Sequence, residues 1–100
     1  DLDVPKLMSD YAEDAVMISA DGVLNGRDSI LKGFFEPNLA QFPDIEFTYD
    51  KVVVEGEICL MQWSAEASGA TVPFGIGVLF VEDGLIQKQV EWFHLVPKGA

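Results

Sequence analysis

Four strand-length stretches joined by very short turns constrain the fold of this chain more than any other feature. The stretches alternate their side chains at a period of two and run over 45–54, 58–68, 71–81 and 85–96. Their separators are Glu55-Gly56-Glu57, Ser68-Gly69-Ala70 and Glu82-Asp83-Gly84. Such short turns join antiparallel neighbours, because a parallel crossover needs about a dozen residues or more. The second half of the chain is therefore predicted to be an antiparallel meander.

The N-terminal segment carries the signals of a short helix over 1–11. Asp3 is a suitable N-cap, Pro5 fits a first turn, and Leu7 and Tyr11 share one helical face. Residues 15–19 are apolar and tolerate an extended conformation, and turn residues follow them.

A second helix is predicted from the apolar stripe within 30–35, whose spacing buries one side of a helix that begins near Arg27. Pro37 should end or kink this helix near Glu36, because its ring clashes with the carbonyl four residues earlier. Helices followed by antiparallel strands indicate the α+β class.

Length and charge exclude several classes of partner. The 100 residues suit one small domain over 1–100, and 49% hydrophobic residues supply its core. Seventeen acidic residues against six basic ones give a net charge of −11. Such an acidic chain would repel nucleic-acid phosphates and anionic lipid surfaces. We therefore expect it to bind neither nucleic acid nor membrane.

Cys59 and His94 are the only cysteine and the only histidine. A disulfide within the chain is excluded, and one chain cannot assemble a soft-metal site from them. We expect no metal and no cofactor. No apolar run has the length of about 18–20 residues that a membrane span needs, so the expected location is the reducing cytoplasm.

Alternation along 71–81 separates large residues from glycines. Val72 and Phe74 fall on the face that also carries residues 76, 78 and 80, whereas Gly75 and Gly77 fall on the other. We expect the large face to line the concave, helix-covered side of the sheet, together with Trp63 of the preceding stretch.

Several segments resemble SnoaL-like and ketosteroid-isomerase-like domains of the nuclear-transport-factor-2-like superfamily. They are Tyr-Ala-Glu-Asp-Ala-Val over 11–16, Asn-Gly-Arg-Asp-Ser-Ile over 25–30 running into Phe34-Phe35, Phe-Val-Glu-Asp-Gly-Leu-Ile over 80–86, and Val-Glu-Trp-Phe over 90–93. The resemblance implies a cone: a curved antiparallel sheet with helices packed on its concave face around a pocket. Family members usually carry a long helix before the position of Asp3, and we expect such a helix, or a replacement, in the native protein.

The resemblance also implies which residues face the pocket, and it turns the Glu91 face of the last strand inward. The substrate-binding candidates are Tyr11, Met17, Ser19, Phe34, Met61, Trp63, Val72, Phe74, Gln89 and Phe93, with Glu91 as the catalytic candidate. Apolar walls with a few polar groups suit a small apolar ligand.

Steroid isomerisation is excluded by the residues themselves. The general base of ketosteroid isomerases would fall on Ser19 and the acid that holds the dienolate oxygen on Ile76, and neither can take its role. Acid–base chemistry of an isomerase, cyclase or hydratase type remains one hypothesis. The alternative is a non-catalytic ligand-binding or association module, so the sequence leaves open whether the protein is an enzyme.

Glu91 is the one acid expected on an otherwise apolar inner wall. Burial without a nearby cation raises the pKa of a carboxyl group toward the range that a general acid or base needs. The alternative is that Glu91 satisfies only a polar spot in the core, through Gln89, Tyr11 or Ser19.

The outer sheet face is expected to form a homodimer, as the resemblance also implies. Val90, Trp92 and Leu79 are too apolar for an open surface, and Gly75 and Gly77 would permit close approach of a second backbone.

Overall fold

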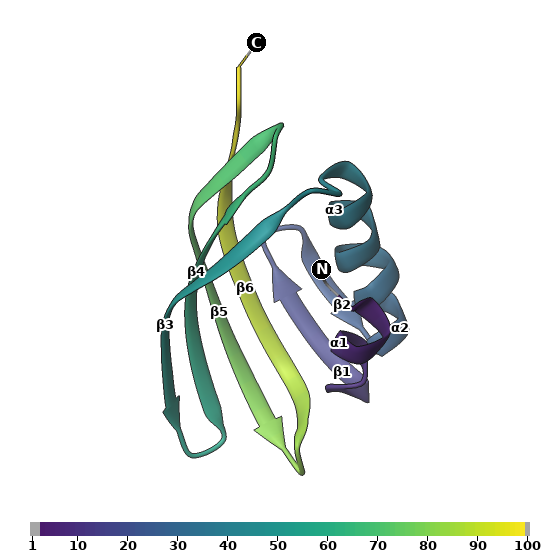
Figure 1. The fold of residues 1–100 in the computed structure, drawn as a ribbon. Coiled ribbons are helices and arrows are strands. Elements are labelled where there is room, and N and C mark those ends of the chain that lie inside the picture. Colours follow the sequence, from purple (N-terminus) through teal and green to yellow (C-terminus); the bar gives the residue numbers. More distant parts are fainter. Residues whose placement is uncertain (1–2, 100) are drawn as a thin grey trace.

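A curved, mixed sheet of six strands forms the body of the computed structural model, which describes residues 3–99 (Figure 1). The strands are β1 (Tyr11–Ser19), β2 (Gly22–Asn25), β3 (Glu46–Glu55), β4 (Ile58–Glu66), β5 (Ala70–Glu82) and β6 (Leu85–Pro97). Their order is β2-β1-β6-β5-β4-β3. The α+β class and the antiparallel meander are confirmed. The parallel pairing of β1 with β6, which joins the N-terminal strands to the meander in one open sheet, was not part of the sequence prediction.

The hairpin turns follow directly from their residues. Asp83 and Gly84 join β5 to β6 with φ of 55° and 76°, the left-handed pair that a two-residue type I′ turn requires. Gly56 lies between β3 and β4 with φ of 59°. These turns set where each of the two hairpins reverses direction, and bulges farther along the strands then shift the register.

The helices lie beside β1 and β2, and α3 leads into the start of β3 (Figure 1). They are α1 (Val4–Met8), α2 (Arg27–Ile30) and α3 (Glu36–Gln41). Asp3 caps α1 by accepting a 3.2 Å hydrogen bond from the Lys6 N–H, as predicted.

Pro37 does not end the second helix. A π-helical turn over Leu31–Phe35 joins α2 to α3, and the Glu36 N–H bonds to the carbonyl of Leu31. This wider turn comes immediately before Pro37, whose ring nitrogen cannot donate to the carbonyl of Gly33 in the preceding turn. The helical segment therefore continues to Gln41 and brings additional apolar side chains over the sheet.

The predicted faces of β5 are wrong beyond Val72. A bulge between Thr71 and Phe74 interrupts the pairing with β6, and from there the alternation is inverted. Gly75 and Gly77 are buried on the concave side, whereas Phe74 is 41% exposed on the convex side. Leu79 is buried on the same side, so neither Leu79 nor the two glycines can belong to the outer face that was expected to dimerise.

Two apolar clusters form the core. One packs α1 and the second helical segment against β1, around Met17 and Ile30, which are completely buried. The other surrounds Trp63 on the concave face of β4 and β5. Every residue of β3 is exposed, so this edge of the concave face has little cover from the described residues. None of the helices within 3–99 is long and apolar enough to cross a membrane.

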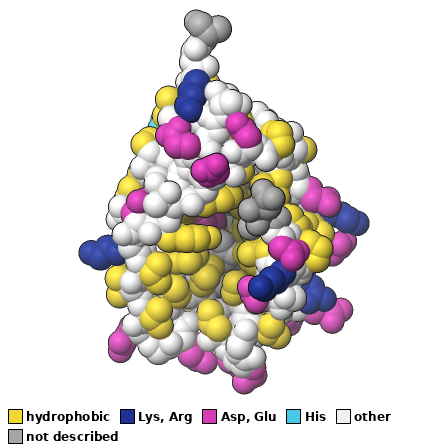
Figure 2. Space-filling model, viewed as in Figure 1, with side chains coloured by type: hydrophobic (Ala, Val, Ile, Leu, Met, Phe, Trp, Pro, Cys, Tyr) yellow, Lys and Arg dark blue, Asp and Glu magenta, His cyan; other side chains and the backbone are white. Residues whose placement is uncertain are grey.

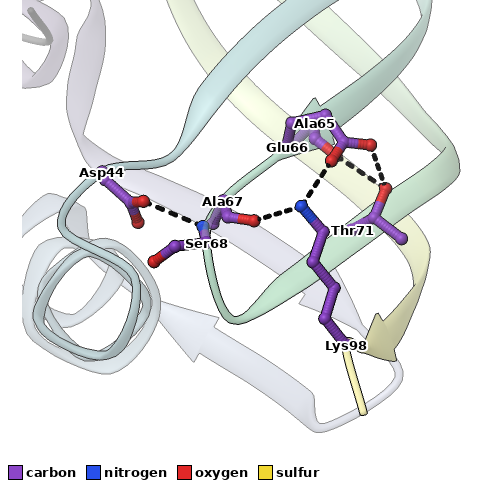
Figure 3. A network of polar contacts seen from close by, with 7 residues as sticks. All are labelled: Asp44, Ala65, Glu66, Ala67, Ser68, Thr71 and Lys98. Carbon is purple, nitrogen blue, oxygen red and sulfur yellow. Dashed lines mark hydrogen bonds and ion pairs between the residues drawn. The ribbon is translucent and has the colours of Figure 1, made fainter. Parts of the chain in front are cut away.

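A surface network ties the β4–β5 turn to its neighbours (Figure 3). The Lys98 ammonium pairs with Glu66 at 2.9 Å and donates to the Ala67 carbonyl at 2.6 Å. The Thr71 hydroxyl donates to Glu66 at 2.5 Å. The Ser68 N–H donates to Asp44 at 2.8 Å and so attaches the segment after α3 to the same turn.

Candidate functional site

A cavity of about 280 Å³ lies between the concave sheet face and the helices. Figure 2 shows apolar side chains gathered around a hollow on this side of the molecule. Eight of the predicted pocket residues line the cavity: Tyr11, Phe34, Met61, Trp63, Val72, Gln89, Glu91 and Phe93. The structure therefore brings most of the predicted site together around one cavity.

Three predicted pocket residues lie elsewhere. Met17 is completely buried in the helix-side core and does not line the cavity. Ser19 ends β1, and its hydroxyl accepts a hydrogen bond from the N–H of Asp21 in the following turn. Phe74 lies on the convex face because of the β5 bulge. Ile76, the position carried over from ketosteroid isomerases, pairs with Trp92 on that same convex face.

Other residues that line the cavity were missed by the sequence reasoning. Leu39 belongs to α3, beyond the predicted break, and Phe42 follows directly after that helix. Phe47 and Tyr49 belong to β3. The pairing of Tyr49 with Trp63 places Tyr49 on the concave side. The period-two spacing of Phe47 and Tyr49 was the signal that could have identified them.

Two glycines of β5 make room for the polar centre of the site. Gly75 pairs with Trp63 of β4, and Gly77 pairs with Glu91 of β6. A methyl group added at Gly75 would overlap the Trp63 indole, and one at Gly77 would overlap the Glu91 carboxyl group. The absence of a side chain at these two positions thus leaves the space in which the Trp63 indole and the Glu91 carboxyl group pack against the sheet.

Glu91 is the acceptor at the centre of a buried hydrogen-bond chain. The Trp63 indole N–H donates to Glu91 Oε2 at 3.1 Å, and the Gln89 amide donates to Glu91 Oε1 at 2.8 Å. The Tyr11 hydroxyl in turn donates to the Gln89 amide oxygen. Both carboxylate oxygens therefore receive a donor, and both donors are neutral.

Burial controls the protonation of this cluster. Loss of hydration raises the pKa of Glu91 to about 7, against the opposing effect of the donors Gln89 and Trp63. Burial, and then the proximity of Glu91, also raises the pKa of the Tyr11 hydroxyl, which keeps that group protonated as a donor. Glu91 can therefore exchange a proton near neutral pH, whereas the Tyr11 hydroxyl keeps its proton.

Aromatic rings continue the wall on both sides of the carboxyl group. Trp63 and Phe93 have ring centroids 5.5 Å apart, and Phe93 meets Phe34 edge to face at 6.3 Å. Phe35 then connects Phe34 to Tyr11 through edge contacts. Rings and hydrogen bonds together form a closed circuit around one side of the cavity.

The described residues do not form a set of metal ligands. Within residues 3–99, no group of three or more His, Cys, Asp or Glu side chains could hold a metal ion. A second hollow of about 380 Å³ lies beside α2, near Arg27 and Glu13, away from the Glu91 cluster.

Comparison with protein families settles the relationship that the fold suggests. The family model described as SnoaL-like domain matches residues 1–89. This chain belongs to the SnoaL-like family. No curated protein matches the SnoaL-like chain.

Solved structures share this fold at low sequence identity. A protein provisionally assigned as a SnoaL-like polyketide cyclase from Jannaschia sp. CCS1 is 15% identical, with a TM-score of 0.76 over 85% of this chain and 67% of its own. One provisionally assigned as a ketosteroid isomerase from Kribbella flavida is 17% identical, with a TM-score of 0.76 over 96% of this chain and 69% of its own. An NTF2-like protein of unknown function from Burkholderia pseudomallei is 17% identical, with a TM-score of 0.77 over 92% and 79%. At these identities the comparison establishes an NTF2-like fold.

Proposed function

We propose that this SnoaL-like domain binds a small apolar molecule in the conical cavity and that Glu91 exchanges a proton with it. One observation carries the proposal: a single buried carboxyl group, 6% exposed, lies in the cavity beside Gln89 and Tyr11, among apolar and aromatic side chains. Burial raises the pKa of Glu91 to about 7, where both protonation states are populated. A group with such a pKa is matched to general acid–base catalysis at neutral pH.

The family supports chemistry of this class, because structural relatives carry provisional assignments as a polyketide cyclase and a ketosteroid isomerase. The ketosteroid isomerase route itself is not available, since Ser19 and Ile76 lie outside the cavity and cannot act as acids or bases there. Glu91 alone must therefore take and return the proton, with Gln89 and Trp63 fixing its two oxygens. The reaction class is an isomerisation, cyclisation or hydration.

Proton exchange at carbon tests the catalytic part. In deuterated buffer, 2-tetralone is an apolar ketone whose protons next to the carbonyl exchange slowly. The ionised Glu91 would accept one such proton, leave an enolate, and return a deuteron after exchange with solvent. We expect the protein to accelerate this exchange by roughly 10²-fold or more, and Glu91→Gln to reduce the rate to the buffer background.

Equal exchange by the wild type and Glu91→Gln would contradict catalysis and favour the alternative, a non-catalytic binding module. Binding is followed independently through the NMR signal of the Trp63 indole N–H, which lies at the cavity wall. If apolar ligands leave that signal unchanged, the cavity is not a binding site. A control variant, Glu57→Gln, removes an exposed carboxylate from the β3–β4 turn and should change neither measurement.

We also propose that two copies associate through the convex sheet face. Six apolar side chains, one from each strand, form an unbroken row across this face: Val23, Ile18, Val90, Val78, Leu60 and Val53. Trp92 beside this row is 49% exposed. An exposed apolar surface of this extent is typical of an interface.

Sedimentation tests the association. A charge of −11 on each copy opposes it, so the homodimer should weaken at low salt, where repulsion is less screened. Trp92→Glu should give a monomer at every salt concentration. A wild-type monomer in both low and moderate salt would refute the proposal.

A further inference from the structure

The cavity contains a carboxylate without a counter-charge. Among its lining residues, all within the described part of the chain, the ionisable groups are Asp10, Glu91, Tyr11 and Tyr49, and none is a lysine, arginine or histidine. The guanidinium of Arg27 contacts the Tyr11 carbonyl at 3.4 Å instead of the cavity. A bound molecule must therefore bring any positive charge that Glu91 is to meet.

The structure assigns a chemical class to the missing partner: we propose that the bound molecule carries a protonated amine, which pairs with Glu91. This inference rests on the proposed binding function of the cavity. A carboxylate offers about four lone-pair directions, and Trp63 and Gln89 use one on each oxygen. Acceptor capacity thus remains on a group that lines the cavity.

The surrounding rings favour the same class of ligand. Trp63, Phe93, Phe34 and Phe47 all line the cavity, and Trp63 is in contact with two of the other rings. Aromatic faces attract an ammonium group through their quadrupole, most strongly where water is excluded. A carboxylate beside several rings is a combination that binds a cation on an apolar body.

Other ligand charges fit less well. An anionic ligand would meet Glu91 and Asp10 without a cation among the lining residues, and the chain charge of −11 would repel it at long range. A neutral ligand would shift Glu91 toward its protonated form, because the ionised carboxylate would have no counter-charge in the desolvated site. An ammonium group neutralises Glu91 and holds it in the ionised form that accepts a proton from carbon.

Three probes with the same apolar body test the inference. They are 2-naphthylethylamine, 2-naphthylethanol and 2-naphthylacetate, which differ mainly in the charge of the end group. Their dissociation constants are measured by calorimetry at a pH above the Glu91 titration. We expect the amine to bind about tenfold or more tightly than the alcohol, and the acetate to bind least.

Glu91→Gln is the matched variant. An amide at position 91 can still accept from Trp63, and a flip of the Gln89 amide restores the chain to the Tyr11 hydroxyl. We expect this variant to lose the amine preference while its affinity for the alcohol changes by less than about threefold. Glu57→Gln, which removes the same charge from an exposed turn, should keep the preference.

The outcomes separate the two proposals. If the amine and the alcohol bind the wild type equally, or if Glu91→Gln keeps the preference, the amine assignment is wrong and the binding cavity stands. If none of the three probes binds, both proposals are wrong. Equal loss of preference in Glu57→Gln would show that bulk charge, not the Glu91 site, selects the amine.

Discussion

Two carboxylates of this protein each lie at the centre of a polar cluster, and their pKa values are shifted in opposite directions from the ordinary value of a glutamate. Glu91 accepts from Trp63 and Gln89 inside the cavity, and its pKa is raised to about 7. Glu66 accepts from Thr71 and pairs with Lys98 at the surface (Figure 3), and its pKa is lowered. Both receive two polar partners, so the number of partners does not explain the difference.

The difference between the two pKa shifts is explained by the hydration of each carboxylate and by the charge of the groups that contact it. Glu66 is exposed, and the Thr71 hydrogen bond, followed by the Lys98 contacts, stabilises its charged form at little desolvation cost. Glu91 is buried beside neutral donors only, and the lost hydration outweighs both hydrogen bonds. The surface carboxylate thus has a positively charged partner in the folded chain, whereas the carboxylate in the cavity has none among the residues that line it. That difference is why we propose a function for the cavity cluster and not for the surface cluster.

The largest expected contrast comes from removing one donor from each cluster. Trp63→Ala should destabilise the protein by about 3–5 kcal/mol, because a buried indole is lost together with its hydrogen bond. Thr71→Ala removes the hydrogen bond from the Thr71 hydroxyl to Glu66 at the surface, and it should lower the stability much less. Urea unfolding of both variants measures the contrast. Similar losses of unfolding free energy in the two variants would mean that the surface cluster contributes more to stability than its exposure implies.

The pH dependence of stability should also separate the two carboxylates. The folded-state pKa of Glu91 is raised from 4.5 to about 7, so its contribution is fully present below pH 4.5 and is lost as the pH rises through 7. The loss is at most roughly 3 kcal/mol. Glu66 behaves in the opposite sense, because its lowered pKa favours the folded state above the unfolded pKa and that contribution disappears on acidification.

Urea unfolding of the wild type and Glu91→Gln at acidic and alkaline pH isolates the Glu91 part. The variant should become more stable relative to the wild type as the pH rises. A constant difference across this range would mean that Glu91 is solvated and titrates at its ordinary pKa.

A third contrast distinguishes the two glycines below the site. Gly75→Ala places a methyl group against the indole of Trp63, which is packed between Phe47 and Phe93 and cannot move aside. We expect a loss of about 1–3 kcal/mol. Gly77→Ala displaces only the end of the Glu91 side chain, so it should cost less stability but change the carboxyl titration.

Gly69→Ala is the control for both glycine variants. Its added methyl group would meet only one ring carbon of Phe42, at 3.9 Å. Chemical denaturation reports the stabilities, and carboxyl NMR reports the titration. The interpretation fails if Gly77→Ala leaves the Glu91 titration unchanged.

The parts of the fold that could be predicted are those fixed by neighbours in sequence. The turns at Gly56 and Asp83-Gly84 determine the hairpins locally, and the strand bounds follow within a few residues. The faces of β5 could not be read from alternation, because a bulge inverts them. Pro73, which lacks the N–H of a ladder bond, was the available sign of that bulge.

The candidate site was predictable only in part, for a similar reason. Gln89, Glu91 and Phe93 share a strand face, so alternation groups them, and the resemblance chose the inward side. Phe42 reaches the cavity because a π-helical turn carries the helix past Pro37, which no periodic pattern announces. The role of the two glycines emerges only when Trp63 and Glu91 are placed above them.

The smallest expected effect concerns the origin of the low pKa of Glu66. The hydrogen bond from Thr71 lowers this pKa most, and the Lys98 contacts follow. Thr71→Val should therefore raise the Glu66 pKa more than Lys98→Met does, and neither variant should change the unfolding midpoint appreciably, since exposed ion pairs contribute little. Carboxyl NMR titration of both variants at low and moderate salt measures the shifts. Because salt screens the Lys98 contribution but not the Thr71 bond, only the Lys98→Met shift should shrink at moderate salt. If Lys98→Met gives the larger shift, charge rather than hydrogen bonding controls this carboxylate, and the contrast with Glu91 depends on the missing cation alone.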